Sequence, residues 1–154
     1  MVAAWRPDRD AGCRGRRTCG APRVEILGGM AEEQDPLTER IIGCATSVHR
    51  VLGPGLLESA YVEALSVELG EAGLRIGRQV PVPLTYKGRY LGEYRLDLLV
   101  EDAVVVEVKA VERFDPVHEA QVLTYLRLTG KRVGLLINFN RRLLREGIKR
   151  LVLG

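Results

Sequence analysis

Three ionisable residues stand inside the most apolar part of the chain, and their types and spacing suit metal-assisted hydrolysis. Asp97 lies in YRLDLLV, and Glu107 and Lys109 lie in VVVEVK. Both stretches are typical of short strands, in which side chains alternate between faces, so Glu107 and Lys109 point to the same side. A hairpin loop with an odd number of residues, such as residues 101–103, would place Asp97 nearly opposite Glu107 on that side.

Two opposed carboxylates repel each other, by up to about 1 kcal/mol in a solvated sheet, so such a pair needs a cation. Carboxylate oxygens are hard ligands that suit Mg²⁺ or Mn²⁺. A lysine beside them can orient or deprotonate the attacking water, or stabilise charge on a phosphate. The set therefore suits hydrolysis of a phosphodiester. On the strand residues alone, however, ordinary ion pairs with Arg95, Lys109 or Arg113 explain the pattern more simply.

Two helical segments add polar side chains to this set. Glu58 lies on an otherwise apolar helical stripe, where a carboxylate needs a cation unless it is an exposed first-turn residue. Gln121 and Tyr125 share a helix face by their i, i+4 spacing, and they could reach a substrate or form an ordinary amphipathic boundary. His118, on the same face, is predicted to be a surface residue at the helix start rather than a metal ligand.

Periodicity and turn residues predict the elements that must position these side chains. Helical spacing, bounded by Asp-Pro pairs or glycines, predicts helices over residues 35–52, 56–69 and 116–129. Alternation between turn residues predicts strands over residues 79–86, 89–100, 104–111 and 132–139. The first three strands are expected to form an antiparallel meander, with the proline-containing first strand at an edge, and the fourth to lie inside the sheet with helices on both faces. Residues 140–154 fit either a short helix or an edge strand.

Composition and charge limit the class of protein. The chain has 154 residues, a length that suits one domain, and no apolar run approaches the roughly 20 residues that span a bilayer. The net charge of +3 lies entirely in residues 1–29, which are rich in Gly, Pro and Arg and have no periodicity. We predict a disordered basic leader over residues 1–34, with Met30 as an alternative start of translation, and one domain over residues 35–154.

The cysteines and aromatic residues carry weaker indications. Cys13 and Cys19 have no second metal-ligand pair nearby, which argues against a zinc site, and Cys44 is predicted to be a buried apolar side chain. We therefore expect a reducing, cytoplasmic location. With 5% aromatic residues, the sequence has no evident stacking platform for single-stranded nucleic acid.

Together, the polar residues resemble the PD-(D/E)XK nuclease superfamily. The order along the chain is that of its RecB-like branch, namely Asp97, then Glu107-Val108-Lys109, then Gln121-x-x-x-Tyr125. A second motif is similar to that of a small bacterial family in this superfamily, called GxxExxY, and reads Gly55-x-x-Glu58-x-x-Tyr61. The resemblance covers about residues 36–153. It departs from the superfamily motif where Leu96 stands in place of the proline before the aspartate.

The resemblance implies an α/β, restriction-endonuclease-like core, in which a mixed β-sheet is flanked by α-helices. It implies one or two Mg²⁺ (or Mn²⁺) ions, held by Asp97, Glu107, Glu58 and the main-chain carbonyl of Val108. It further implies that Lys109 acts on the water and that Gln121 and Tyr125 bind the substrate.

We therefore expect a Mg²⁺-dependent nuclease that hydrolyses phosphodiester bonds through metal-activated water. Its expected partner is nucleic acid, with DNA favoured, and no membrane. The alternative is a catalytically silent nucleic-acid or protein-interaction module of the same fold.

Overall fold

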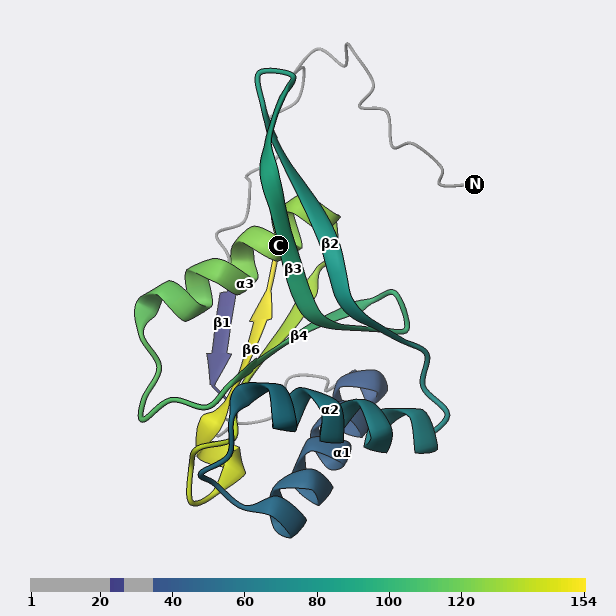
Figure 1. Cartoon of the computed structure of the whole chain (residues 1–154), viewed down its shortest axis with the longest axis vertical. Coiled ribbons are helices and arrows are strands. Elements are labelled where there is room, and N and C mark those ends of the chain that lie inside the picture. The colour runs from purple at the N-terminus through teal and green to yellow at the C-terminus, as the bar shows by residue number, and fades with distance from the viewer. Residues whose placement is uncertain (1–22, 27–34) are drawn as a thin grey trace.

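The computed structural model describes residues 23–26 and 35–154, and these residues form a mixed sheet with helices on both faces (Figure 1). The strand order is β1-β6-β5-β4-β3-β2. The helices are α1 (Pro36–Leu52), α2 (Glu58–Glu71) and α3 (Pro116–Thr129), with a 3-10 turn η1 (Leu144–Gly147). The strands are β1 (Arg23–Ile26), β2 (Ile76–Tyr86), β3 (Arg89–Val100), β4 (Val104–Lys109), β5 (Val133–Asn138) and β6 (Ile148–Val152).

The predicted meander is confirmed. Strands β2, β3 and β4 pair antiparallel, and β2 is the edge strand that its prolines indicated. The β3–β4 loop has three residues, since Val100 pairs with Val104 and Leu98 with Val106. The ladder ends at the Leu98–Val106 pair, so Asp97 and Glu107 come directly after it, where the two strands separate. Leu98 packs in the core with α1 and α2 whereas Leu96 packs in the core with α3, so β3 turns at Asp97. Strands β4 and β5 are parallel, and β5 lies inside the sheet as predicted.

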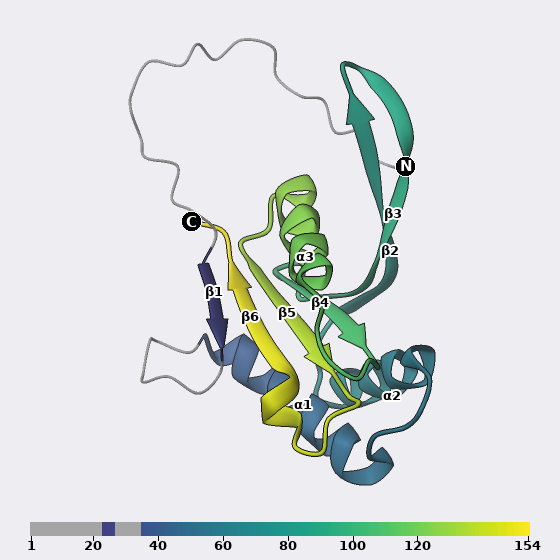
Figure 2. The ribbon, with the colours of Figure 1, turned by 90° about the vertical axis from the view of Figure 1, so that its left-hand side faces the viewer.

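Each face of the sheet has its own core. Val104, Val106 and Val108 pack with α1 and α2, whereas Val105 packs with α3 on the other face. Figure 2 shows α3 apart from the α1–α2 pair. Because side chains alternate along β4, Glu107 must lie on the α3 side with Val105. The α3 helix comes close to the sheet over Gly134, where an added Cβ would lie 2.6 Å from a methyl group of Val122.

The helix starts follow local sequence. Asp35 accepts a hydrogen bond from the Leu37 amide, and Pro36 opens α1. Asp115 caps α3 in the same way, and the ring of His118 accepts a hydrogen bond from the Asp115 amide in a reciprocal cap. The prediction of His118 as a helix-start residue is therefore confirmed. Cys44 is buried, as predicted.

Some expected boundaries were wrong. The second helix begins at Glu58 and not at residue 56, and the third strand ends at Lys109 and not at 111. The C-terminal tail contains both a 3-10 turn and a strand, and that strand, β6, lies between β5 and β1 rather than at an edge.

The prediction of a disordered leader over residues 1–34 was also wrong for one short stretch. Residues 23–26 form β1, whose backbone pairs antiparallel with β6. Four residues are too few for a clear alternation, so their partner strand rather than their own pattern makes them a strand. The rest of residues 1–34, including Cys13, Cys19 and Met30, lies outside the described residues. Within the described ranges, no helix is long and apolar enough to cross a membrane.

Candidate active site

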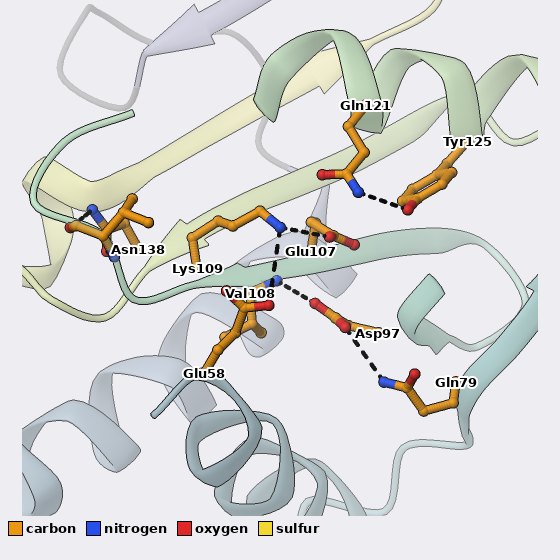
Figure 3. A network of polar contacts seen from close by, with 10 residues as sticks. Glu58, Gln79, Asp97, Glu107, Val108, Lys109, Gln121, Tyr125 and Asn138 are labelled. Atoms are coloured by element: carbon orange, nitrogen blue, oxygen red, sulfur yellow. Dashed lines mark hydrogen bonds and ion pairs between the residues drawn. The ribbon is translucent and has the colours of Figure 1, made fainter. Parts of the chain in front are cut away.

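The β3–β4 hairpin brings Asp97, Glu107 and Lys109 together (Figure 3). The Asp97 Oδ2 atom accepts a hydrogen bond of 2.9 Å from the Val108 amide. In a strand, the N–H and C=O of one residue point to the same neighbour, so the Val108 carbonyl also faces the Asp97 side. The Lys109 carbonyl points the other way and accepts a hydrogen bond from Phe139. The carboxylate of Asp97 and the carbonyl of Val108 therefore face a common space.

Glu107 is the most deeply buried acid of the site. It is 3% exposed, and the Lys109 ammonium lies 3.0 Å from its Oε1 atom. Its Oε2 atom is buried and has no hydrogen-bond partner among the described residues. Burial, followed by the nearby charge of Asp97, raises the pKa of Glu107 to about 7. One buried carboxylate oxygen is thus left for a ligand.

Lys109 lies between two acids. Its Nζ atom is 3.0 Å from Glu107 and 4.0 Å from Glu58. Burial acts to lower the pKa of Lys109, but Glu107, Glu58 and Asp97 together raise it above its usual value. The side chain is therefore an ammonium at neutral pH, suited to orienting a water or stabilising negative charge rather than to accepting a proton.

The first residue of α2 brings the third acid. Glu58 is half-buried, and burial raises its pKa above the usual value, against the opposing effect of Lys109. The preceding loop is held by Tyr61, whose hydroxyl donates to the Gly53 carbonyl at 2.5 Å and accepts from the Leu56 amide. Gly55 has a φ of 107° there, which side chains rarely tolerate. The Gly55 and Tyr61 positions thus set where Glu58 points.

Helix α3 covers the other side of the acids. The Gln121 amide donates a hydrogen bond of 2.8 Å to the Tyr125 hydroxyl, and both side chains lie above Glu107 and Lys109 in Figure 3. Burial, followed by the charge of Glu107, raises the pKa of Tyr125. The Tyr125 hydroxyl is therefore a neutral hydrogen-bonding group next to the buried acid.

Two positioning residues were missed from the sequence. Gln79, in a left-handed conformation with a φ of 47°, donates a hydrogen bond of 3.4 Å to Asp97. Asn138, 1% exposed, accepts a hydrogen bond from the Val111 amide and donates one to its carbonyl, so it holds the chain as it leaves β4. Asn138 could have been found as the polar residue in the apolar stretch RVGLLINF; Gln79 had no such signal.

The oxygens present fit a divalent cation. Glu107 Oε2 is buried and without a partner among the described residues, and Glu58 and Asp97 line one cavity of about 450 Å³. Hard oxygen ligands of this kind are those that Mg²⁺ prefers. In the part of the chain that the structure describes, no three His, Cys, Asp or Glu side chains are already grouped as a metal cage. Glu58 and Glu107 meet instead through Lys109.

Comparison with known proteins agrees with this fold. The mixed sheet with helices on both faces is the α/β arrangement of restriction-endonuclease-like proteins, as expected from the sequence. A family model described as the PD-(D/E)XK nuclease superfamily matches residues 35–151, and the chain belongs to that superfamily. No curated protein and no solved structure matches the chain. Membership supports a nuclease-like function acting on nucleic acid.

Proposed function

We propose that this protein is a divalent-metal-dependent nuclease that hydrolyses phosphodiester bonds, with DNA as its favoured substrate and the bacterial cytoplasm as its location. One observation carries the proposal: a buried carboxylate oxygen of Glu107 has no partner among the described residues and belongs to a cluster with Asp97 and the Lys109 ammonium. Burying like charges is costly unless a cation or a ligand offsets them. Such clusters are typical of functional sites.

The metal ligands in this proposal are Asp97, Glu107, Glu58 and the Val108 carbonyl. The chemistry that Mg²⁺ or Mn²⁺ supplies when bound is activation of a water and neutralisation of phosphate charge. Burial keeps the site at low dielectric, where each charge acts more strongly on the reacting phosphate.

The remaining residues act on the water and the substrate. The Lys109 ammonium orients the attacking water and stabilises the negative charge that develops on the phosphate. Gln121 and Tyr125, on α3, donate hydrogen bonds to the substrate from the side of the site that lies across from Glu58. The loop contacts of Tyr61 and the φ of Gly55 support assignment to the GxxExxY branch, because they give both motif residues a role in presenting Glu58.

The test is cleavage by the full chain and by Lys109→Met. Incubation with Mg²⁺ and assorted DNA and RNA substrates should yield products that EDTA abolishes. Loss of a single charge-stabilising donor lowers the rate by about 100-fold or more, and Lys109→Met should do so without weakening substrate binding. Lys131→Met is the matched control, because Lys131 is also largely buried but pairs with Asp102 at the other end of β4.

The alternative function is a binding module of the same fold that has no catalytic activity. Tight binding of nucleic acid with no cleavage at any Mg²⁺ or Mn²⁺ concentration would contradict the enzymatic proposal and favour this module. Equal cleavage by Lys109→Met and the intact protein would contradict the role of Lys109.

A further inference from the structure

The outer part of the β2–β3 hairpin, residues 81–95, begins beside α3 and extends beyond the rest of the sheet. Figures 1 and 2 show this from two directions, and we call the segment the arm. Three of the five tyrosines of the chain are on it, and all three are exposed: Tyr86 by 61%, Tyr90 by 65% and Tyr94 by 45%. Exposed aromatic side chains grouped in this way indicate a binding surface.

The strand register sorts these tyrosines between the two faces of the arm. Cross-strand partners share a face, as do alternate residues of one strand. Val82, which packs in the core beneath α3, pairs with Tyr94. Tyr86 lies four residues after Val82 and shares its face. Along β3, a bulge at Leu91 interrupts the alternation, because Leu84 pairs with Gly92 but Thr85 with Tyr90. Tyr90 therefore lies on the face of Thr85, opposite to that of Tyr86 and Tyr94.

The face with Tyr94 and Tyr86 begins at the candidate active site. Tyr94 packs edge-on against Tyr125, with 6.1 Å between ring centroids. Between them and the exposed side of α3 lies a cavity of about 390 Å³, lined by Tyr94, Val117, Ala120, Gln121, Thr124 and Tyr125. Its walls are apolar, with the Gln121 amide and the Thr124 hydroxyl as polar groups, which is the composition of a pocket for a flat, partly polar ring.

The arm also carries positive charge. Its charged residues are three cations and one carboxylate, namely Lys87, Arg89, Arg95 and Glu93, of which Arg95 pairs with Glu93. Arg89 is the cross-strand partner of Tyr86, and the Lys87 ammonium lies 5.5 Å from the centre of the Tyr86 ring. Aromatic rings interleaved with cations bind single-stranded nucleic acid, because bases stack on the rings and phosphates meet the cations.

We infer that the α3-facing side of the arm, together with the cavity beside Tyr94 and α3, binds single-stranded nucleic acid and leads an unpaired strand to the active site. From Val82 to Tyr86 the arm spans roughly 13 Å, four residues at about 3.3 Å each, enough for about four stacked nucleotides at about 3.4 Å. This inference rests on the proposed function, because only a nuclease would cleave the strand that the arm delivers, but binding of the strand can be measured separately from cleavage. It differs from the expectation, drawn from the low aromatic content, that no stacking platform is evident.

The test is fluorescence anisotropy of a labelled oligothymidylate, with EDTA present so that no cleavage occurs. Tyr94→Ala and Tyr86→Ala should each weaken binding by roughly 5-fold to 150-fold, the effect of losing one stacked base. Tyr90→Ala is the matched control, since Tyr90 is equally exposed on the other face, and its affinity should change by less than about twofold. Oligouridylate, measured in parallel, tells whether the strand is DNA or RNA.

Two further probes separate stacking from charge. An abasic strand of equal length should bind more weakly than oligothymidylate. Tyr94→Ala should bind this abasic strand as tightly as the intact protein does. A blunt duplex should bind more weakly than the single strand.

Several results would overturn the inference: equal losses in Tyr90→Ala and Tyr86→Ala, equal affinity for the abasic and the intact strand, or a preference for duplex. So would a dimer that becomes monomeric in Tyr86→Ala, because the arm would then bind a second copy of the chain. Binding through Tyr86 and Tyr94 without any cleavage would contradict the proposed function alone. Cleavage with unchanged binding in both variants would contradict this inference alone.

Discussion

Glu107→Gln should stabilise the metal-free protein at neutral pH. Burial, followed by the nearby charge of Asp97, raises the pKa of Glu107 from 4.5 to about 7. The folded state therefore holds a proton between these two pH values that the unfolded state has released. Stability falls as pH rises through this window, because the unfolded state binds fewer protons there. Glutamine has the shape of the protonated acid and carries no charge to bury.

The size of the effect follows from the same two values. Each unit of pKa shift corresponds to about 1.4 kcal/mol, so the penalty on ionised Glu107 is about 3 kcal/mol. Glu107 is 3% exposed, so solvent screens little of it. The difference between Glu107→Gln and the intact protein should be near zero below pH 4.5 and should reach its full size above pH 7.

Urea unfolding in EDTA across this pH range measures the difference directly. Glu63→Gln is the control, because Glu63 lies on the exposed surface and its replacement should change stability by no more than about 0.5 kcal/mol at any pH. If Glu107→Gln is no more stable than the intact protein at pH 8, the reasoning is refuted, because the cost of burying the ionised carboxylate must then be offset in the folded state.

Two further variants test the metal ligands and the frame of the site. Asp97→Ala should abolish the heat of Mn²⁺ binding in calorimetric titration. Asp102→Ala, a change in the exposed β3–β4 loop, is the control and should bind Mn²⁺ as the intact protein does. Unchanged Mn²⁺ binding in both variants would reject Asp97 as a ligand. Asn138→Ala should lower the free energy of unfolding in urea by about 1–3 kcal/mol, because the Val111 amide and carbonyl lose their buried partner; a loss no larger than that of Asn140→Ala would contradict this role.

Much of the backbone that positions the site residues depends on local sequence, and it was predictable for that reason. The three-residue loop after Val100 brings Asp97 and Glu107 directly after the Leu98–Val106 pair, and the alternation of β4 puts Glu107 and Lys109 on one face, since the side-chain period of a strand is two. The starts of α1 and α3 follow from Asp-Pro pairs, whose capping contacts span only a few residues. Both features use neighbours in sequence, so no knowledge of the fold was needed.

Other features depend on residues that are far apart in the chain. Strand β1 exists because β6 is available to pair with it, and Glu58 meets Lys109 because Tyr61 holds the loop before α2. The composition, with few aromatic residues, gave no sign that Tyr86 and Tyr94 would share one face of an extended hairpin.

The sequence by itself determined which chemical groups are present, their order, and the face of β4 that Glu107 and Lys109 share, because these depend on local backbone geometry. Tertiary structure alone decided how deeply Glu107 is buried, which cation lies beside it, and which aromatic rings stand next to the acids. Burial and electrostatic interaction arise from the packing of segments distant in sequence, and they set the pKa values and the shape on which any reaction at this site depends.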